Sequence, residues 1–113
     1  MNMFRMMMLL CFVIAVNSPA LAQGFGEKDS QKHSMITSLK AYAVYKMGQY
    51  DEAYALWLPI AEAGNTTAMI NIANMYLQGQ GRAVDIAKAR AWLLKAQEAG
   101  DERAAEQLLE IEG

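Results

Sequence analysis

The chain has 113 residues, enough for one small domain, and a formal net charge of −2 from 12 acidic and 10 basic residues. This mild negative balance argues against a nucleic-acid surface, which needs a clustered basic field. The single cysteine and single histidine, Cys11 and His33, argue strongly against a thiol-dependent enzyme, a disulfide scaffold and a multi-ligand transition-metal site.

The first 22 residues have the pattern of a secretory signal peptide. Arg5 precedes an unbroken apolar run at 6–16, and a small-x-small sequence ends at Ala22. The run is shorter than the roughly 20 apolar residues that a membrane-spanning helix needs. We therefore expect cleavage between Ala22 and Gln23, which would also remove Cys11. The product would be periplasmic or secreted, and would meet the membrane only during export.

In the rest of the chain, capping residues, glycines and a proline mark where helices are expected to begin and end. Residues 23–33 are polar with no apolar period, so we expect a flexible lead-in before helices begin at Ser34. Alanine is frequent and only one proline, Pro59, follows residue 22; we expect a kink there and not a helix end. The expected helices run over about 34–47, about 51–63, from behind an Asn65 N-cap to about 77, from an Asp85 N-cap to Gly100, and over about 102–111 behind an Asp101 cap. Connections this short predict antiparallel neighbours in an all-α fold.

The chain also repeats itself. LWLPIAEAGNTTA at 56–68 aligns with WLLKAQEAGDERA at 92–104 at an offset of 36, and YKMGQ at 45–49 aligns with YLQGQ at 76–80 at an offset of 31. Two helix–turn–helix units in series, at about 37–67 and 68–103, predict a short α-solenoid of antiparallel helix pairs. The helix at 102–111 would close it as a capping helix, with Leu109 among its core-facing residues.

The pattern A-x3-I-A-x2-Y-x2-G-x-G, then D-x2-K-A-x2-W-x2-K-A, then G-x3-A, over 68–104, resembles the Sel-1-like repeat, a relative of the tetratricopeptide repeat. Ala73 departs from it, because the family usually has glycine there. The unit at 37–68 is degenerate and closer to a plain tetratricopeptide unit. The resemblance implies structural roles for Tyr45, Gly48, Ala53, Leu56, Gly64, Ala68, Ile72, Tyr76, Gly79, Gly81, Asp85, Ala89, Trp92, Ala96, Gly100 and Ala104. Trp57 and Trp92 are the largest expected core residues.

No pattern in the sequence marks a catalytic residue, a cofactor site or a metal site. His33 lies in the lead-in without fixed geometry, and Gly79-x-Gly81 lacks the Lys-Ser/Thr of a phosphate loop. We therefore predict that the chain is not an enzyme and binds neither cofactor nor metal.

A polar helix face is the one candidate binding feature. In solenoids of this class, ligands commonly lie in a groove lined by the first helix of each pair. Asn71, Asn74 and Gln78 fall at i, i+3 and i+7, and Lys40 holds the place of Asn71 in the preceding unit. Such side chains can hydrogen-bond the backbone or terminal carboxylate of an extended peptide. The alternative is a merely solvated face.

Three functional hypotheses follow. The leading one is a non-catalytic exported adaptor or scaffold that binds a protein or peptide partner in the cell envelope. The second is an envelope enzyme or cell-wall-ligand binder, because some exported members of the family are linked to β-lactam hydrolysis or cell-wall binding. The third is a structural subunit of an envelope complex that associates through the 34–47 helix, which leaves a homo-oligomer open.

Overall fold

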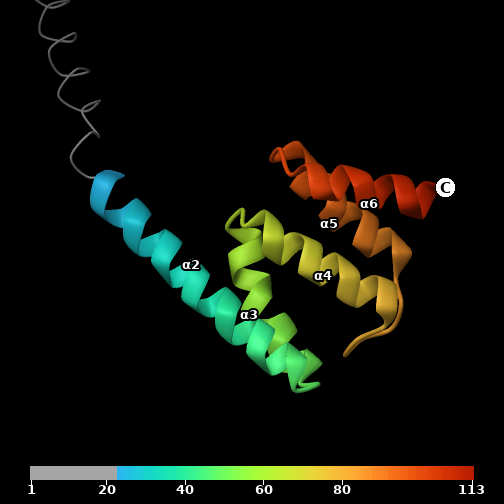
Figure 1. Cartoon of the computed structure of the whole chain (residues 1–113), viewed down its shortest axis with the longest axis horizontal. Coiled ribbons are helices and arrows are strands. Elements are labelled where there is room, and N and C mark those ends of the chain that lie inside the picture. The colour runs from blue at the N-terminus through green and yellow to red at the C-terminus, as the bar shows by residue number, and fades with distance from the viewer. Residues whose placement is uncertain (1–22) are drawn as a thin grey trace, which may run out of the picture. The chain divides into compact units, whose positions relative to one another are not determined.

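The computed structural model describes residues 23–113, and this range is all-helical with no strand, so the predicted all-α class is confirmed (Figure 1). The helices are α2 (Gln23–Lys46), α3 (Tyr50–Glu62), α4 (Thr66–Gln78), α5 (Ile86–Glu98) and α6 (Glu102–Glu112). The predicted signal peptide, with Ala22 at its cleavage site, lies outside the described residues. The chain divides into two units, 1–32 and 33–113, and all packing described below lies within the second.

The first described helix is longer than its sequence pattern predicts. We expected it to begin at Ser34, but α2 begins at Gln23 and includes the whole of 23–33. The N-terminal turns hold Glu27, Lys28 and Gln31, which have high intrinsic helix propensity, and no proline interrupts them. Propensity therefore extends this helix without an apolar stripe. None of the helices within 23–113 is both long enough and apolar enough to cross a membrane.

Helices α4, α5 and α6 begin directly after the cap residues that the sequence predicts. The side chains of Asn65 and Asp85 accept hydrogen bonds from the backbone amides of Ala68 and Lys88, and so cap α4 and α5. The Asp101 side chain caps α6 in the same way. Helix α3 continues through Pro59, as expected. These local signals therefore locate the N-termini of three helices.

Glycines with left-handed backbone conformations lie in the connections between the helices. Within 23–113, five residues have positive φ, and all five are glycines to which the repeat pattern assigns a structural role: Gly48, Gly64, Gly79, Gly81 and Gly100. Gly81 carries a second constraint, because a Cβ added there would lie 2.8 Å from the Cβ of Tyr50. The connection between α4 and α5 therefore packs directly against the start of α3.

Alanines let the helices of the second unit approach closely. Eight of them are fully buried: Ala41, Ala53, Ala61, Ala68, Ala73, Ala89, Ala96 and Ala104. Larger side chains fill the space between them, chiefly Trp57, Ile72, Met75 and Leu93. The core is centred on α4, which packs against both α3 and α5. A close helix crossing needs small residues at the contact, and the repeat pattern had placed alanine at five of these positions.

Two expected core residues are not buried. Trp92 is only partly buried on α5, where the Lys95 ammonium lies 4.7 Å from its ring centroid. Leu109 is 72% exposed on α6. The core prediction is wrong for Leu109 and holds only in part for Trp92, which packs against the edge of the core. Helical periodicity indicates a face of the helix but not which neighbouring helix covers that face.

Candidate functional site

Two hydrogen bonds join α2 to α4 and to the connection that follows α4. The Asn65 side-chain amide donates to the Ser34 hydroxyl at 3.2 Å, and these residues are 31 apart in sequence. The Tyr45 hydroxyl donates to the side-chain oxygen of Gln80 at 2.8 Å. Because one bond joins the beginnings and the other the ends of the two segments, residues 34–46 of α2 run in the same direction as α4.

A second set of hydrogen bonds joins the starts of α4 and α6. The Thr66 hydroxyl donates to Asp101 Oδ2 at 2.8 Å, and Arg103 Nη2 donates to the Thr67 hydroxyl at 2.9 Å. Thr67 and Arg103 are 36 residues apart, which equals the offset of the sequence repeat. The two offsets found in the sequence therefore recur as hydrogen bonds in the structure, between Ser34 and Asn65 and between Thr67 and Arg103.

The predicted amide face lies along the one strip of α4 that is not buried. Asn71 and Asn74 are half-buried and Gln78 is exposed, whereas seven other residues of this helix are buried. Within residues 23–113, none of the three amides makes a side-chain hydrogen bond. Their donors and acceptors are therefore available, and their spacing along the helix suits repeated contacts with an extended chain.

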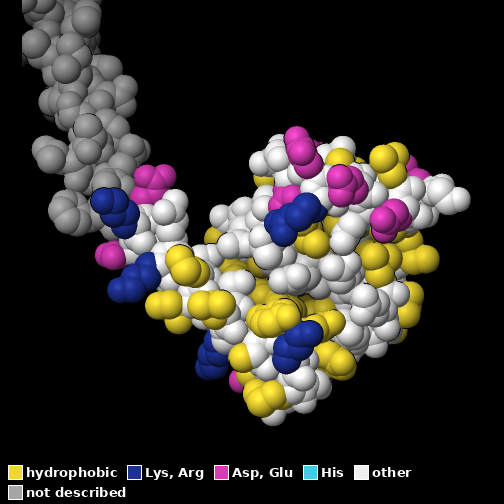
Figure 2. Space-filling view, in the orientation of Figure 1, with side chains coloured by type: hydrophobic (Ala, Val, Ile, Leu, Met, Phe, Trp, Pro, Cys, Tyr) yellow, Lys and Arg dark blue, Asp and Glu magenta, His cyan; other side chains and the backbone are white. Residues whose placement is uncertain are grey.

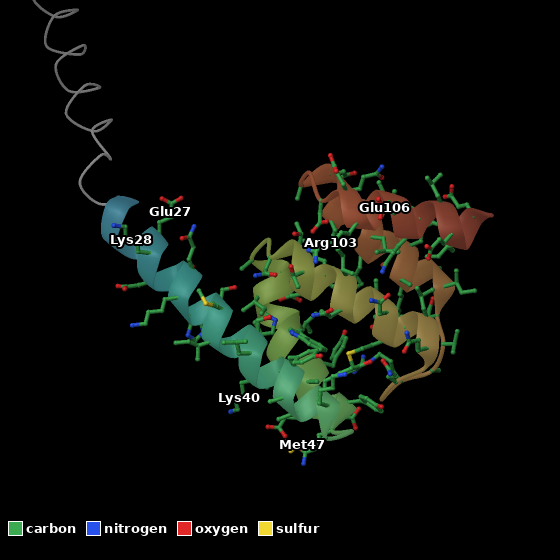
Figure 3. The ribbon with its side chains drawn as sticks, in the orientation of Figure 1. Glu27, Lys28, Lys40, Met47, Arg103 and Glu106 are labelled. Carbon is green, nitrogen blue, oxygen red and sulfur yellow. The ribbon has the colours of Figure 1, made fainter. Side chains whose placement is uncertain are left out.

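Lys40 has the same register in α2 as Asn71 has in α4. Each lies six residues beyond its member of the Ser34–Asn65 hydrogen bond. The Lys40 side chain extends from α2 into solvent, and no ion pair within the described range engages it (Figure 3). Lys40 of α2 and Asn71 of α4 therefore occupy the same position relative to this hydrogen bond.

The row continues onto α6 at a residue that the sequence prediction omitted. Gln107 lies 36 residues after Asn71, and its side-chain oxygen is shielded from solvent with no hydrogen-bond partner in the described part of the chain. Applying the repeat offset once more would have found it. We call Lys40, Asn71, Asn74, Gln78 and Gln107 the polar row.

A separate polar cluster joins α3, α4 and the connection that follows α4. The Tyr54 and Tyr76 hydroxyls lie 3.1 Å apart, and their rings meet edge to face. The Arg82 guanidinium lies 3.2 Å from the Tyr54 ring centroid, and the Lys88 ammonium lies 5.6 Å from that of Tyr76. Stacking of a guanidinium on a tyrosine face is a favourable cation–π contact. These residues lie on α3, α4, the connection after α4 and α5, and no spacing rule links them, so this cluster was not predictable from the sequence.

The two phenols of this cluster differ in acidity. Burial raises the pKa of the Tyr54 hydroxyl, and its hydrogen bond to Tyr76 raises it further. Burial also acts to raise the pKa of Tyr76, but the hydrogen bond with Tyr54 and the nearby positive charges of Arg82 and Lys88 outweigh it, and the pKa is lowered. Through Arg82, the cluster packs the connection at 79–85 against α3 and α4.

The cluster at the start of α6 is ionic. Asp101 accepts hydrogen bonds from the Thr66 hydroxyl and from the backbone and side chain of Arg103, and its side chain is 10% exposed. The Arg103 hydrogen bond, with that of Thr66, holds the pKa of the Asp101 carboxyl well below its usual range. The pKa of Arg103 is raised by the same pairing. Together with Ala99, Gly100 and Glu102, these residues line a surface depression.

His33 is exposed on α2. Within residues 23–113, no three His, Cys, Asp or Glu side chains are grouped so as to hold a metal ion.

No protein-family model, curated protein or solved structure matches the chain.

Proposed function

We propose that the chain is a non-catalytic exported adaptor or scaffold that binds an extended segment of a protein partner along the polar row. The observation that carries this proposal is the strip of amides without side-chain hydrogen bonds on α4, at Asn71, Asn74 and Gln78, in a helix that has seven buried residues. Amides that present both donors and acceptors at a regular spacing can pair with a peptide backbone.

The repeat contacts support a short α-solenoid for the second unit. The hydrogen bonds between equivalent residues, the shared positive-φ glycines and the buried alanines are those expected of stacked helix pairs of the Sel-1-like kind. In such a stack the first helices of successive pairs lie side by side. Lys40, Asn71 and Gln107 would then form one transverse line of the polar row, with Lys40 available to a partner's carboxylate.

Export is the second part of the proposal, and it rests on the N-terminal pattern that ends at Ala22 and Gln23. It places the adaptor in the periplasm or outside the cell. Fractionation of cells that produce the full chain with a C-terminal tag tests this point. A shortened protein in the periplasm or medium is the expected result, and a full-length cytoplasmic protein would contradict it.

The adaptor proposal is tested by crosslinking in cells followed by capture of the tagged chain. We expect a partner that is captured by the parent and lost with Lys40→Glu/Asn71→Ala/Asn74→Ala. The matched control, Lys95→Glu/Gln97→Ala/Gln49→Ala, changes one lysine and two amides at exposed positions outside the row, and should retain the partner. Overlapping peptides of that partner should then include one whose binding, followed by fluorescence anisotropy, depends on the row.

Two outcomes would contradict the adaptor proposal. Retention of the partner by the polar-row variant would move the binding surface elsewhere. Hydrolysis of a β-lactam by the purified chain, lost on substitution of one polar-row residue, would make the chain an envelope enzyme. Circular dichroism of each variant, compared with the parent, separates loss of binding from loss of folding.

A further inference from the structure

The terminal helices of the second unit leave open a face that the central helix buries. Ile70 and Ala73 of α4 are 6% and 0% exposed. Their equivalents in α2, at the offset of 31, are Leu39 and Tyr42, which are 65% and 52% exposed. The equivalent of Ala73 in α6, at the offset of 36, is Leu109, which is 72% exposed.

The difference follows from position in the chain. Helix α4 packs between α3 and α5, whereas the main packing partner of α6 is α5, and only the start of α6 reaches α4. On α2, Met35, Leu39 and Tyr42 follow one another at i, i+4 and i+7, which is one face of a helix. We call Met35, Leu39, Tyr42 and Lys46 the α2 face. The apolar side chains over this part of α2 are visible in Figure 2.

The open face of α6 has the opposite charge. Glu102, Glu106 and Leu109 also lie at i, i+4 and i+7, and all three are exposed; we call them the α6 face. On the α2 segment 34–46 the charged residues are Lys40 and Lys46, and Lys46 lies 5.4 Å from the Tyr42 ring centroid. Figure 2 shows acidic side chains gathered over α6.

We propose that the α2 face of one molecule docks on the α6 face of a second copy, head to tail. Each face has exposed apolar side chains, namely Met35, Leu39 and Tyr42 on the α2 face and Leu109 on the α6 face. Lys46 of the α2 face is complementary in charge to Glu102 and Glu106 of the α6 face. Pairing two α2 faces would instead leave both Lys46 side chains without a carboxylate, and pairing two α6 faces would bring four glutamates together. A contact between two different faces repeats from molecule to molecule, so it builds a ring or an open chain. This inference goes beyond the adaptor proposal, because it uses the ends of the unit and leaves the polar row free.

Thiol crosslinking between two tagged copies of the full chain tests the direction of this contact. In a Cys11→Ser background, one copy carries Leu39→Cys and the other Leu109→Cys. Both side chains are exposed, so neither substitution removes core packing. After treatment of cells with a short bismaleimide, we expect a product that carries both tags. Cells with the Leu39→Cys copies alone should give none, and neither should a Leu39→Cys copy with Leu94→Cys, an exposed control site on α5.

Charge reversal provides the second measurement. Lys46→Glu or Glu106→Lys alone should reduce the mixed product several-fold, and the two together should restore it. The control Glu52→Lys, at an exposed site on α3, should leave the yield unchanged. The proposal is overturned by a product from Leu39→Cys alone, which would mean that α2 faces pair with each other. It is also overturned by a product with a different protein, or by no product. Partner capture through the polar row would be unaffected by any of these results.

Discussion

The central helix and the two terminal helices use similar side chains in different surroundings. Helix α4 has seven buried residues and one narrow polar strip, whereas α6 buries only Ala104 and Leu108. At positions related by the repeat, an apolar residue is core in α4 and surface in α2 or α6. Burial of a side chain in these helices is thus set by the number of helices that pack around it, and not by the residue type alone.

The largest loss of stability should come from truncating a buried side chain of α4. The Ile72 side chain is completely buried in the core. Ile72→Ala should therefore lower the free energy of unfolding by about 2–5 kcal/mol, because apolar burial is lost and a cavity remains. Leu39→Ala, on the exposed part of α2, should change stability by less than about 0.5 kcal/mol. Urea unfolding followed by circular dichroism measures both. Equal losses would show that α2 is as enclosed as α4.

The next effect separates two glycines with the same backbone conformation. Both Gly48 and Gly81 have positive φ, at 81° and 71°. Gly48→Ala meets no atom within 4 Å, so it should cost only the left-handed penalty of about 1–2 kcal/mol. Gly81→Ala should cost more, because the new Cβ would lie 2.8 Å from Tyr50 Cβ and force the connection away from α3. A smaller loss for Gly81→Ala than for Gly48→Ala in the same unfolding assay would contradict this packing.

A smaller effect compares the equivalent residues Ser34 and Asn65. Asn65 caps α4 and also donates to the Ser34 hydroxyl, so Asn65→Ala should cost roughly 0.5–2 kcal/mol. Ser34 lies inside α2 and caps nothing, so Ser34→Ala loses only the shared hydrogen bond and should cost less. Thermal unfolding of the two variants ranks them. A Ser34→Ala variant as unstable as Asn65→Ala would indicate that the shared bond, and not the cap, holds α4 in place.

Short-range signals made most of the fold predictable. Asn65, Asp85 and Asp101 cap helices because their side chains bond amides two or three residues away, and this depends on little else. The positive-φ glycines are predictable for the same reason. On the candidate site, the repeat offset placed Asn71 in register with Lys40, and the same offset leads to Gln107.

Features that depend on distant neighbours were not predictable. Trp92 and Leu109 occupy apolar positions of their helices, yet no helix covers them fully. The stacking of Arg82 on Tyr54 joins a connection to an earlier helix and follows no spacing rule. The start of α2 was missed because residues 23–33 are polar and have no apolar period, whereas good helix formers among them allow the helix to begin at Gln23.

The smallest expected effect concerns the contact between the starts of α4 and α6, and it depends on pH. Hydrogen bonds from Arg103 and Thr66 lower the pKa of Asp101 below its ordinary value of 3.8. A lowered native pKa means that ionised Asp101 stabilises the fold above the unfolded pKa, and that this contribution is lost as the pH falls through the lower native value. Asp101→Asn keeps an N-cap side chain but removes the charge. The parent should therefore be the more stable protein at neutral pH, and the difference in thermal midpoint should shrink progressively below about pH 4. Arg103 is exposed, so solvent and salt should weaken the difference. A difference in midpoint that does not depend on pH would show that the shape of the Asp101 side chain, and not its charge, joins α6 to α4.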